Sequence, residues 1–269
     1  MVYAYRFAQQ RKKSLSLTTK LILTNVFLYI VGIFLLSIFG EDFLLNNIAL
    51  TPEFILSGKK IWTFLTSMFM HGSFFHLFAN MFSLFFIGSF LEKIIGKKRF
   101  FWIYFISGIV GGLFFVGANY LMETSNSAVG ASGAIFGLLG VLAVLVPYSK
   151  VYLIAGPLIL ILAQFILGNF VSANIMTLFS FFINLLIILM IFSLFSFNSS
   201  LRKLAVPVEL PMWLLPLVAI IPLTIISYFF PLPIGNSAHI GGLVTGLIYG
   251  FLLRKKFPNK TKKLRNTFK

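Results

Sequence analysis

The chain has 269 residues, of which 59% are hydrophobic and only 10% are charged, whereas a soluble globular domain is about a quarter charged. This composition excludes a soluble globular protein and indicates a polytopic membrane protein. Lys and Arg outnumber Asp and Glu by 22 to 6, and the formal net charge is +16. The chain has no cysteine, which excludes disulfides, thiol catalysis and thiolate metal sites. Neither a cofactor nor a metal is predicted.

Apolar runs along the chain predict its membrane spans, since a spanning helix needs roughly 20 apolar residues. The first run is longer than the apolar core of a signal peptide and ends in FGEDF without a small-x-small cleavage site, so we expect it to be retained. The fifth run is short for a span. The eight candidate runs are 21–39, 73–91, 101–121, 131–147, 151–167, 175–197, 211–230 and 238–253.

The basic residues predict the topology of these spans. They fall into groups that lie between alternate runs, namely 1–20, 93–99, Lys150, Arg202 with Lys203, and 254–269. Placing these groups in the cytoplasm leaves only Lys59 and Lys60 outside, as the positive-inside rule favours. Eight spans with both termini cytoplasmic follow, and the net charge then needs no nucleic-acid partner. The basic segments 1–20 and 254–269 are expected at the membrane surface, attracted to anionic lipid.

Polar residues inside the spans indicate where a function could lie, because a polar group in hydrocarbon is costly unless it is paired or functional. All three histidines are of this kind: His71 and His76 lie with Asn80 in MHGSFFHLFANMF, and His239 lies in NSAHIGGLVTGLIYG. The runs that begin at 73, 131 and 238 all enter from the outer face. At about 1.5 Å per residue, Ser132, His239, His76 and Asn80 lie within roughly 10 Å of that face.

Glycines in two of these runs predict that the fourth and last spans approach closely. Gly133 and Gly137 form one GxxxG pattern, and a longer one runs through Gly242, Gly246 and Gly250. Such an approach would bring Ser132 to His239.

A serine beside a histidine can act as a nucleophile whose proton the imidazole accepts. None of the six acidic residues falls within a span at this depth, so the pair would be a dyad and not a triad. Candidate donors to an oxyanion are His76, Asn80 and the backbone N–H of Ser132. Other interpretations stay open: GxxxG patterns and a helical serine are common in inert helix packing, and Ser, His and Asn can line a transporter or proton path.

At these residues the sequence resembles the rhomboid family of intramembrane serine proteases. HGSFFHLFAN fits the family pattern H-x4-H-x3-N, GASG fits G-x-S-G, and AHIGGLVTG fits A-H-x3-G-x3-G. Weaker support comes from LEKIIGKKRF, with Glu92, Gly96 and Phe100. The resemblance covers roughly 20–147 and 211–253.

The resemblance implies an all-α membrane protein in which a Ser-His dyad cleaves transmembrane segments of other proteins near the outer face. The expected partners are transmembrane substrates and the lipid bilayer, and the expected location is a bacterial plasma membrane. The implied roles are Ser132 as nucleophile, His239 as base, His76 and Asn80 in the oxyanion hole, Phe136 packed on the catalytic histidine, His71 as a structural hydrogen-bonding residue, and Gly130 and Gly133 as supporting residues of the serine motif.

Two departures from the family pattern affect these expectations. Trp62 is followed by Thr63 where family members often carry Arg, so we expect the anchoring of the first outer loop to differ from that of the family. The 107 residues between Ser132 and His239 leave room for three spans instead of one. We therefore expect a six-helix core within a membrane domain 21–253, with 151–197 as a two-helix insertion. A non-proteolytic relative that binds membrane proteins is the alternative within the family.

Overall fold

The structure is a computed structural model and describes residues 14–168, 170–193, 196, 198–229 and 235–268. Most of the predicted basic segment 1–20, namely residues 1–13, therefore lies outside the described residues. The chain divides into two compact units, residues 1–145 with 219–258, and residues 146–218 with 259–269. The predicted insertion 151–197 falls inside the second unit.

Helices dominate both units, and the all-α membrane fold is confirmed. Within the described residues, five helices are long and apolar enough to span a membrane: Leu17–Phe39, Phe74–Ile95, Lys97–Leu121, Asn174–Ser193 and Asn236–Lys256. Three shorter apolar helices are Ser132–Leu145, Ala155–Gly168 and Leu215–Ile225. Each of the eight predicted apolar runs thus contains a helix.

The first helix of the first unit is α1 (Leu17–Phe39), and the unit continues along the chain to residue 145. The segment between residues 40 and 73 forms short helices. The elements are α2 (Glu41–Asn47), α3 (Pro52–Leu56), α4 (Thr63–Thr66), the 3-10 helix η1 (Ser67–Phe69), α5 (Phe74–Ser83), the π-helical turn η2 (Leu84–Gly88), α6 (Ser89–Ile95), α7 (Lys97–Leu121) and α8 (Ser132–Leu145). Later in the chain come α12 (Leu215–Phe229), whose residues from 219 onward belong to this unit, and α13 (Asn236–Lys256).

The start of α1 is fixed by a carboxylate that lies far away in the sequence. Glu92, at the end of the second span, accepts hydrogen bonds from the backbone N–H groups of Leu17 and Thr18 at 2.9 and 2.8 Å. The Thr18 hydroxyl donates a third bond to it at 2.7 Å. Ser16 caps the same helix by accepting from the Thr19 N–H. A negative charge at a helix N-terminus also interacts favourably with the positive end of the helix dipole. Because of these contacts, α1 begins four residues before the predicted apolar run.

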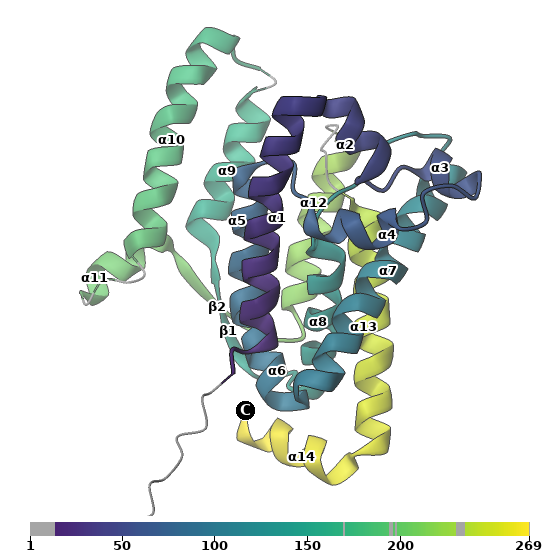
Figure 1. The fold of residues 1–269 in the computed structure, drawn as a ribbon. Coiled ribbons are helices and arrows are strands. Elements are labelled where there is room, and N and C mark those ends of the chain that lie inside the picture. Colours follow the sequence, from purple (N-terminus) through teal and green to yellow (C-terminus); the bar gives the residue numbers. More distant parts are fainter. Residues whose placement is uncertain (1–13, 169, 194–195, 197, 230–234, 269) are drawn as a thin grey trace, which may run out of the picture. The chain divides into compact units, whose positions relative to one another are not determined.

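Helix α8 is the centre of the first unit, and α7 and α13 pack along it (Figure 1). Every residue from Gly133 to Leu145 is buried except Phe136. The contact with α13 is made backbone to backbone: a Cβ placed on Gly242 or on Gly246 would overlap the carbonyl groups of Gly133 and Gly137, respectively. The predicted close approach of the fourth and last spans is confirmed, and small residues are what permits it.

The second unit contains a short sheet that the sequence interpretation did not include. Strands β1 (Lys150–Ile154) and β2 (Pro207–Pro211) pair antiparallel, with Lys150 opposite Pro211 and Ile154 opposite Pro207. The prediction that the fifth span begins at 151 is therefore wrong, since its helix begins at Ala155. A short apolar run is equally compatible with a strand and with a helix, and here Pro207 and Pro211 favour an extended partner segment.

An exposed ion pair joins the two strands. Lys150 Nζ lies 2.7 Å from a Glu209 carboxylate oxygen, and the Tyr152 hydroxyl donates to Glu209 at 3.1 Å. Hydrogen bonding to the Lys150 ammonium, then to Tyr152, lowers the pKa of Glu209, and the bond to Glu209 raises the pKa of Lys150. Both groups are exposed, so the pair is a minor source of stability.

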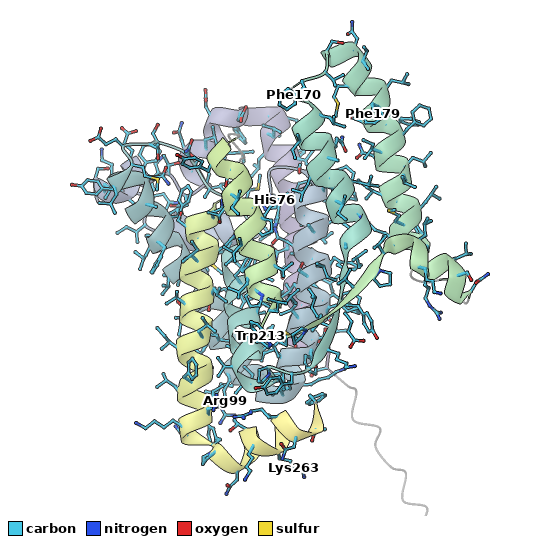
Figure 2. The ribbon with its side chains drawn as sticks, turned by 180° about the vertical axis from the view of Figure 1, so that it is seen from behind. His76, Arg99, Phe170, Phe179, Trp213 and Lys263 are labelled. Atoms are coloured by element: carbon cyan, nitrogen blue, oxygen red, sulfur yellow. The ribbon has the colours of Figure 1, made fainter. Side chains whose placement is uncertain are left out.

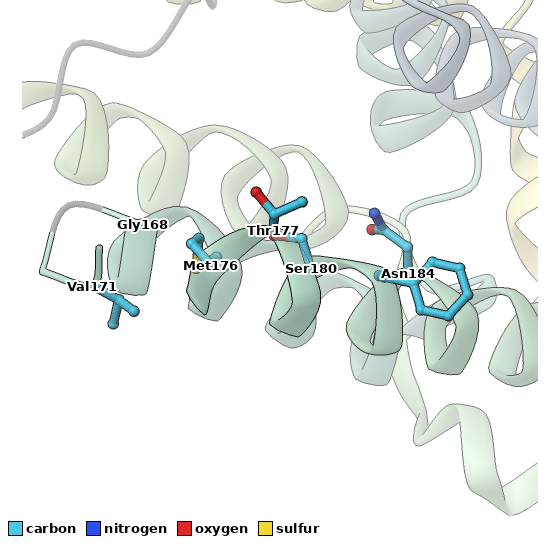
Figure 3. Close-up of a pocket in the computed structure, with 7 residues that line it drawn as sticks. Gly168, Val171, Met176, Thr177, Ser180 and Asn184 are labelled. Atoms are coloured by element: carbon cyan, nitrogen blue, oxygen red, sulfur yellow. The ribbon is translucent and has the colours of Figure 1, made fainter. Parts of the chain in front are cut away.

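Along the chain, two helices lie between the strands: α9 (Ala155–Gly168) and α10 (Ala173–Ser193). Thr177, Ser180 and Asn184 give α10 one polar edge, because a spacing of three or four residues places side chains on one helical face. This edge lines a cavity of about 620 Å³ together with Gly168, Val171, Met176 and Phe181 (Figure 3). The unit also contains α11 (Ser199–Arg202), the 3-10 helix η3 (Lys203–Ala205) and most of α14 (Pro258–Thr267).

Candidate active site

Ser132 and His239 lie within hydrogen-bond distance of one another in the first unit. Ser132 is the first residue of α8, and His239 lies in the first turn of α13. The distance between Ser132 Oγ and His239 Nε2 is 2.8 Å. The imidazole is buried, with 7% of its surface exposed. The pair forms because Gly133, the residue after Ser132, and Gly242, one turn after His239, let the two backbones touch.

Among the described residues, the ring of His239 is held by stacking and not by a carboxylate. The Phe136 ring lies one helical turn after Ser132, and its centroid is 4.5 Å from that of His239 with 21° between the planes. The other ring nitrogen, Nδ1, is buried and has no hydrogen-bond partner in the described part of the chain. Serine hydrolase triads orient the histidine through an acidic residue on that nitrogen, so the geometry here is that of a two-residue arrangement.

His76 and Asn80 lie on α5 against the segment that leads into Ser132. A Cβ added to Gly130 would lie 2.8 Å from His76 Nε2 and 3.6 Å from Asn80 Nδ2. The amide of Asn80 donates to the His76 backbone carbonyl at 3.1 Å. Gly130 has φ of +125°, which is a conformation that favours glycine. A larger residue at 130 would therefore be strained and would also displace the His76 ring.

Backbone hydrogen bonds hold the segment before Ser132. Leu50 and Ala128 exchange two of them, at 2.9 and 3.0 Å, and the Gly130 N–H donates to the Ser67 carbonyl at 2.8 Å. The residues before the nucleophile candidate are thus tied to the segment between α1 and α5. Such long-range backbone pairing has no local signal in the sequence, and Ser67 was not among the predicted site residues.

His71 lies just before α5 and is almost completely buried, with 2% exposed. Its ring packs edge-on against that of His76, with 5.1 Å between the centroids. The helix itself begins at Phe74 because Ser73 caps it, accepting a hydrogen bond from the His76 N–H at 3.1 Å. His76, labelled in Figure 2, therefore has its backbone fixed by the cap and its ring flanked by His71 and Gly130.

A third helix, α7, shapes the site through residues that the sequence interpretation missed. A Cβ on Gly111 would lie 2.7 Å from the carbonyl oxygen of Ala238, the residue before His239. One could have found Gly111 from the sequence SGIVGG, whose small residues Ser107 and Gly111 repeat at a four-residue interval. Helix α7 thus packs against the start of α13, where a residue larger than Gly111 would not fit.

Comparison with known proteins shows the family of this chain. A family model, "Rhomboid domain", matches residues 58–192 and 182–256. Similar curated proteins are "RHOMBOID-like protein 1" of Arabidopsis thaliana, 40% identical over 92 residues that are 34% of this chain and 23% of that protein, and "Inactive RHOMBOID-like protein 8" of the same plant, 40% identical over 86 residues, 32% and 23%. "Putative rhomboid protease YdcA" of Bacillus subtilis (strain 168) is 36% identical over 118 residues, 42% and 57%.

The fold and the site define a multi-pass α-helical membrane protein with a partly buried serine–histidine pair. The chain belongs to the rhomboid family. Membership supports a function of the intramembrane-protease type. The chain spans only about a quarter of the length of the two plant relatives and 57% of the bacterial one. Because one of these relatives is named as inactive, an activity of this chain has to be inferred from its own residues.

Proposed function

We propose that the protein is an intramembrane serine endopeptidase in which Ser132 is the nucleophile and His239 is the general base. The observation that carries the proposal is the 2.8 Å distance between Ser132 Oγ and His239 Nε2. A base must lie within about 2.6–3.2 Å of the proton that it accepts, and this pair meets that condition without any rearrangement.

The reaction follows from this geometry. His239 Nε2 accepts the Ser132 hydroxyl proton while Oγ attacks the carbonyl carbon of the scissile amide. The tetrahedral intermediate collapses when the imidazolium returns the proton to the leaving nitrogen, which breaks the C–N bond and leaves an acyl ester on Ser132. A water molecule, deprotonated by the same imidazole, then attacks the ester and releases the carboxylic acid product and the free hydroxyl.

The negative charge of the intermediate requires donors, and three sources converge on the start of α8. Ser132 is the first residue of that helix, so its N–H is among those without an intrahelical acceptor. The positive end of the helix dipole lies at the same point. His76 and Asn80 flank Gly130 on the other side, and we assign their side-chain N–H groups to the oxyanion together with the Ser132 N–H. Gly130 and Gly133 support this arrangement by leaving space.

The topology of the proposal places this site near the outer membrane face. Both termini would be cytoplasmic, since the basic groups flank the opposite ends of the spans. The substrates would be transmembrane segments of other proteins, whose helices must unwind before the amide is exposed, since unwinding in lipid leaves backbone groups unpaired. We further propose that residues 21–253 form the membrane domain, that 151–197 is an insertion into it, and that the protein resides in a bacterial plasma membrane.

The test is proteolysis of a model transmembrane substrate by the purified full chain reconstituted in liposomes. Ser132→Ala and His239→Ala are expected to abolish cleavage. Ser37→Ala is the matched control, because Ser37 is an exposed helical serine that bonds only its own helix, at the Phe34 carbonyl. Cleavage by either site variant at the wild-type rate would refute the assignment.

A second measurement separates this proposal from its alternatives. A serine-reactive fluorophosphonate should label the wild type at Ser132 and should not label Ser132→Ala. A folded protein that neither cleaves nor reacts would instead be a non-proteolytic binding factor, and this outcome would overturn the proposal. Saturable uptake of a solute into the liposomes that survives Ser132→Ala would favour a transporter.

A further inference from the structure

A cavity of about 440 Å³ lies where the first turn of α7 meets the last turns of α13 in the first unit. Its volume is in the range of small-molecule sites, about 300–1,000 Å³. None of the candidate active-site residues lines it, and His239 lies at the opposite end of α13. The seven residues that line the cavity are Arg99, Tyr249, Leu252, Leu253, Lys255, Lys256 and Phe257.

The charged side chains of this lining are all cationic. Arg99, Lys255 and Lys256 contribute three positive charges, and none of the described residues that line the cavity carries a carboxylate. The guanidinium of Arg99 is partly fixed, because Nη1 donates to the Ile95 carbonyl at 3.3 Å and the group lies 4.8 Å from the centroid of the Phe257 ring. These contacts leave most of its donors free to bind an anion, and a guanidinium suits a phosphate in shape and charge.

The rest of the lining is uncharged and mostly apolar, and it continues onto an exposed apolar surface. Tyr249, Leu252 and Leu253 lie two to seven residues before the lysines on α13. Leu252 and the neighbouring Phe251 are each 57% exposed, which in a membrane-spanning helix means contact with acyl chains. The cavity therefore has a cationic end and an apolar end, arranged along the direction of the helix.

We propose that this cavity binds the headgroup of an anionic glycerophospholipid. Its phosphate would contact Arg99, Lys255 and Lys256, and an acyl chain would follow Tyr249 and Leu252 along α13. A free phosphate would use only the cationic end, whereas an anionic lipid matches both ends. Basic pockets between transmembrane helices at the cytoplasmic side are suited to such headgroups, and this is the side on which the basic groups of the chain gather.

The experiment measures which lipids stay bound to the purified full chain. The protein is reconstituted in nanodiscs of equal parts phosphatidylglycerol and phosphatidylcholine and extracted into detergent, and retained lipids are identified by native mass spectrometry. Wild type is expected to retain phosphatidylglycerol preferentially. Lys255→Gln with Lys256→Gln should lower that retention about tenfold or more, because the loss of a direct hydrogen bond to a charged phosphate costs roughly tenfold. Both lysines are exposed, so the variant should fold.

The matched control is Lys20→Gln with Lys93→Gln, which removes two exposed lysines outside the cavity that are predicted to lie on the same side of the membrane. It should retain phosphatidylglycerol like the wild type. Equal loss in both double variants would show diffuse attraction instead of a site, and no loss in the cavity variant would refute the site outright. Arg99→Gln provides an independent variant with the same expected direction.

A last arm distinguishes lipid from free phosphate. Inorganic phosphate at millimolar concentration should not displace the retained phosphatidylglycerol, and displacement would overturn the lipid assignment. Because lipid retention needs no catalysis, the same measurements on Ser132→Ala should give the wild-type pattern. Failure of the lipid site and failure of the proposed protease activity are therefore separate results.

Discussion

Replacing Gly242 by alanine should separate the two residues of the proposed dyad. Gly242 lies one turn after His239 and faces Gly133, the residue after Ser132. A Cβ there would lie 2.8 Å from the Gly133 carbonyl carbon and closer still to its oxygen, whereas ordinary contacts begin at 3.4 Å. The helices must part by at least about 0.6 Å to clear the carbon alone. The 2.8 Å distance between Ser132 Oγ and His239 Nε2 would then be stretched to the limit of a hydrogen bond.

The expected loss of cleavage is about 10- to 100-fold, because a misplacement of about 1 Å in a catalytic pair can cost about 100-fold. The assay is the rate of cleavage of a transmembrane substrate in liposomes, measured with substrate in excess so that kcat is reported. Gly117→Ala is the matched control, since Gly117 lies in α7 and an added Cβ would meet nothing within 4 Å. The control should cleave at the wild-type rate.

Thermal unfolding in detergent shows whether the Gly242→Ala variant is folded, and fluorophosphonate labelling reports Ser132 directly. A folded variant should label more slowly, because the serine has lost its base. Wild-type kcat and labelling in a folded Gly242→Ala protein would refute the reasoning, since the contact between Gly133 and Gly242 would then not determine the geometry of the pair.

Three other predictions follow from particular contacts. Phe136→Leu removes the ring that stacks on His239. Because an aromatic pair contributes about 0.5–1.5 kcal/mol, kcat should fall about 2- to 10-fold with the protein still folded. A rate unchanged from wild type would argue against orientation of His239 by stacking. Glu92→Gln weakens the three hydrogen bonds to the start of α1. Denaturation in detergent should show a free energy of unfolding lower by about 1–3 kcal/mol, while fluorophosphonate labelling should change little. Because the chain has no cysteine, Ser172→Cys and Thr124→Cys can each be labelled alone by an impermeant maleimide. Both variants should react from the outer face. Reaction of the two variants from opposite faces of the membrane would contradict the two-helix insertion.

Much of the fold was predictable from composition and periodicity, because a membrane leaves few choices for an apolar segment. Runs of about 20 apolar residues became helices, and the glycine patterns on two of them predicted their contact. The failures lie where the sequence signal is ambiguous or distant. The apolar run at 151 could begin as strand or helix, and its pairing with Pro207–Pro211 depends on residues more than 50 positions away.

The site shows the same division. Ser132 and His239 could be paired from depth and glycine spacing, and they lie in hydrogen-bond distance. The ties that hold the segment before Ser132, from Leu50 to Ala128 and from Gly130 to Ser67, could not be predicted. They join backbone groups more than 60 residues apart, and a backbone group carries no sequence identity that would reveal its partner.

The absence of a carboxylate beside His239 changes what determines the geometry of the site. In a triad, a hydrogen bond to Nδ1 orients the imidazole; here, among the residues that the structure describes, that nitrogen has no partner. The ring is instead placed by the backbone contact between α8 and α13 and by the Phe136 face. Helix packing therefore has to supply the precision that a third residue would otherwise provide, and close-packed interiors yield little to an added methyl group. The glycines of this contact are thus part of the proposed active site, although none of them reacts.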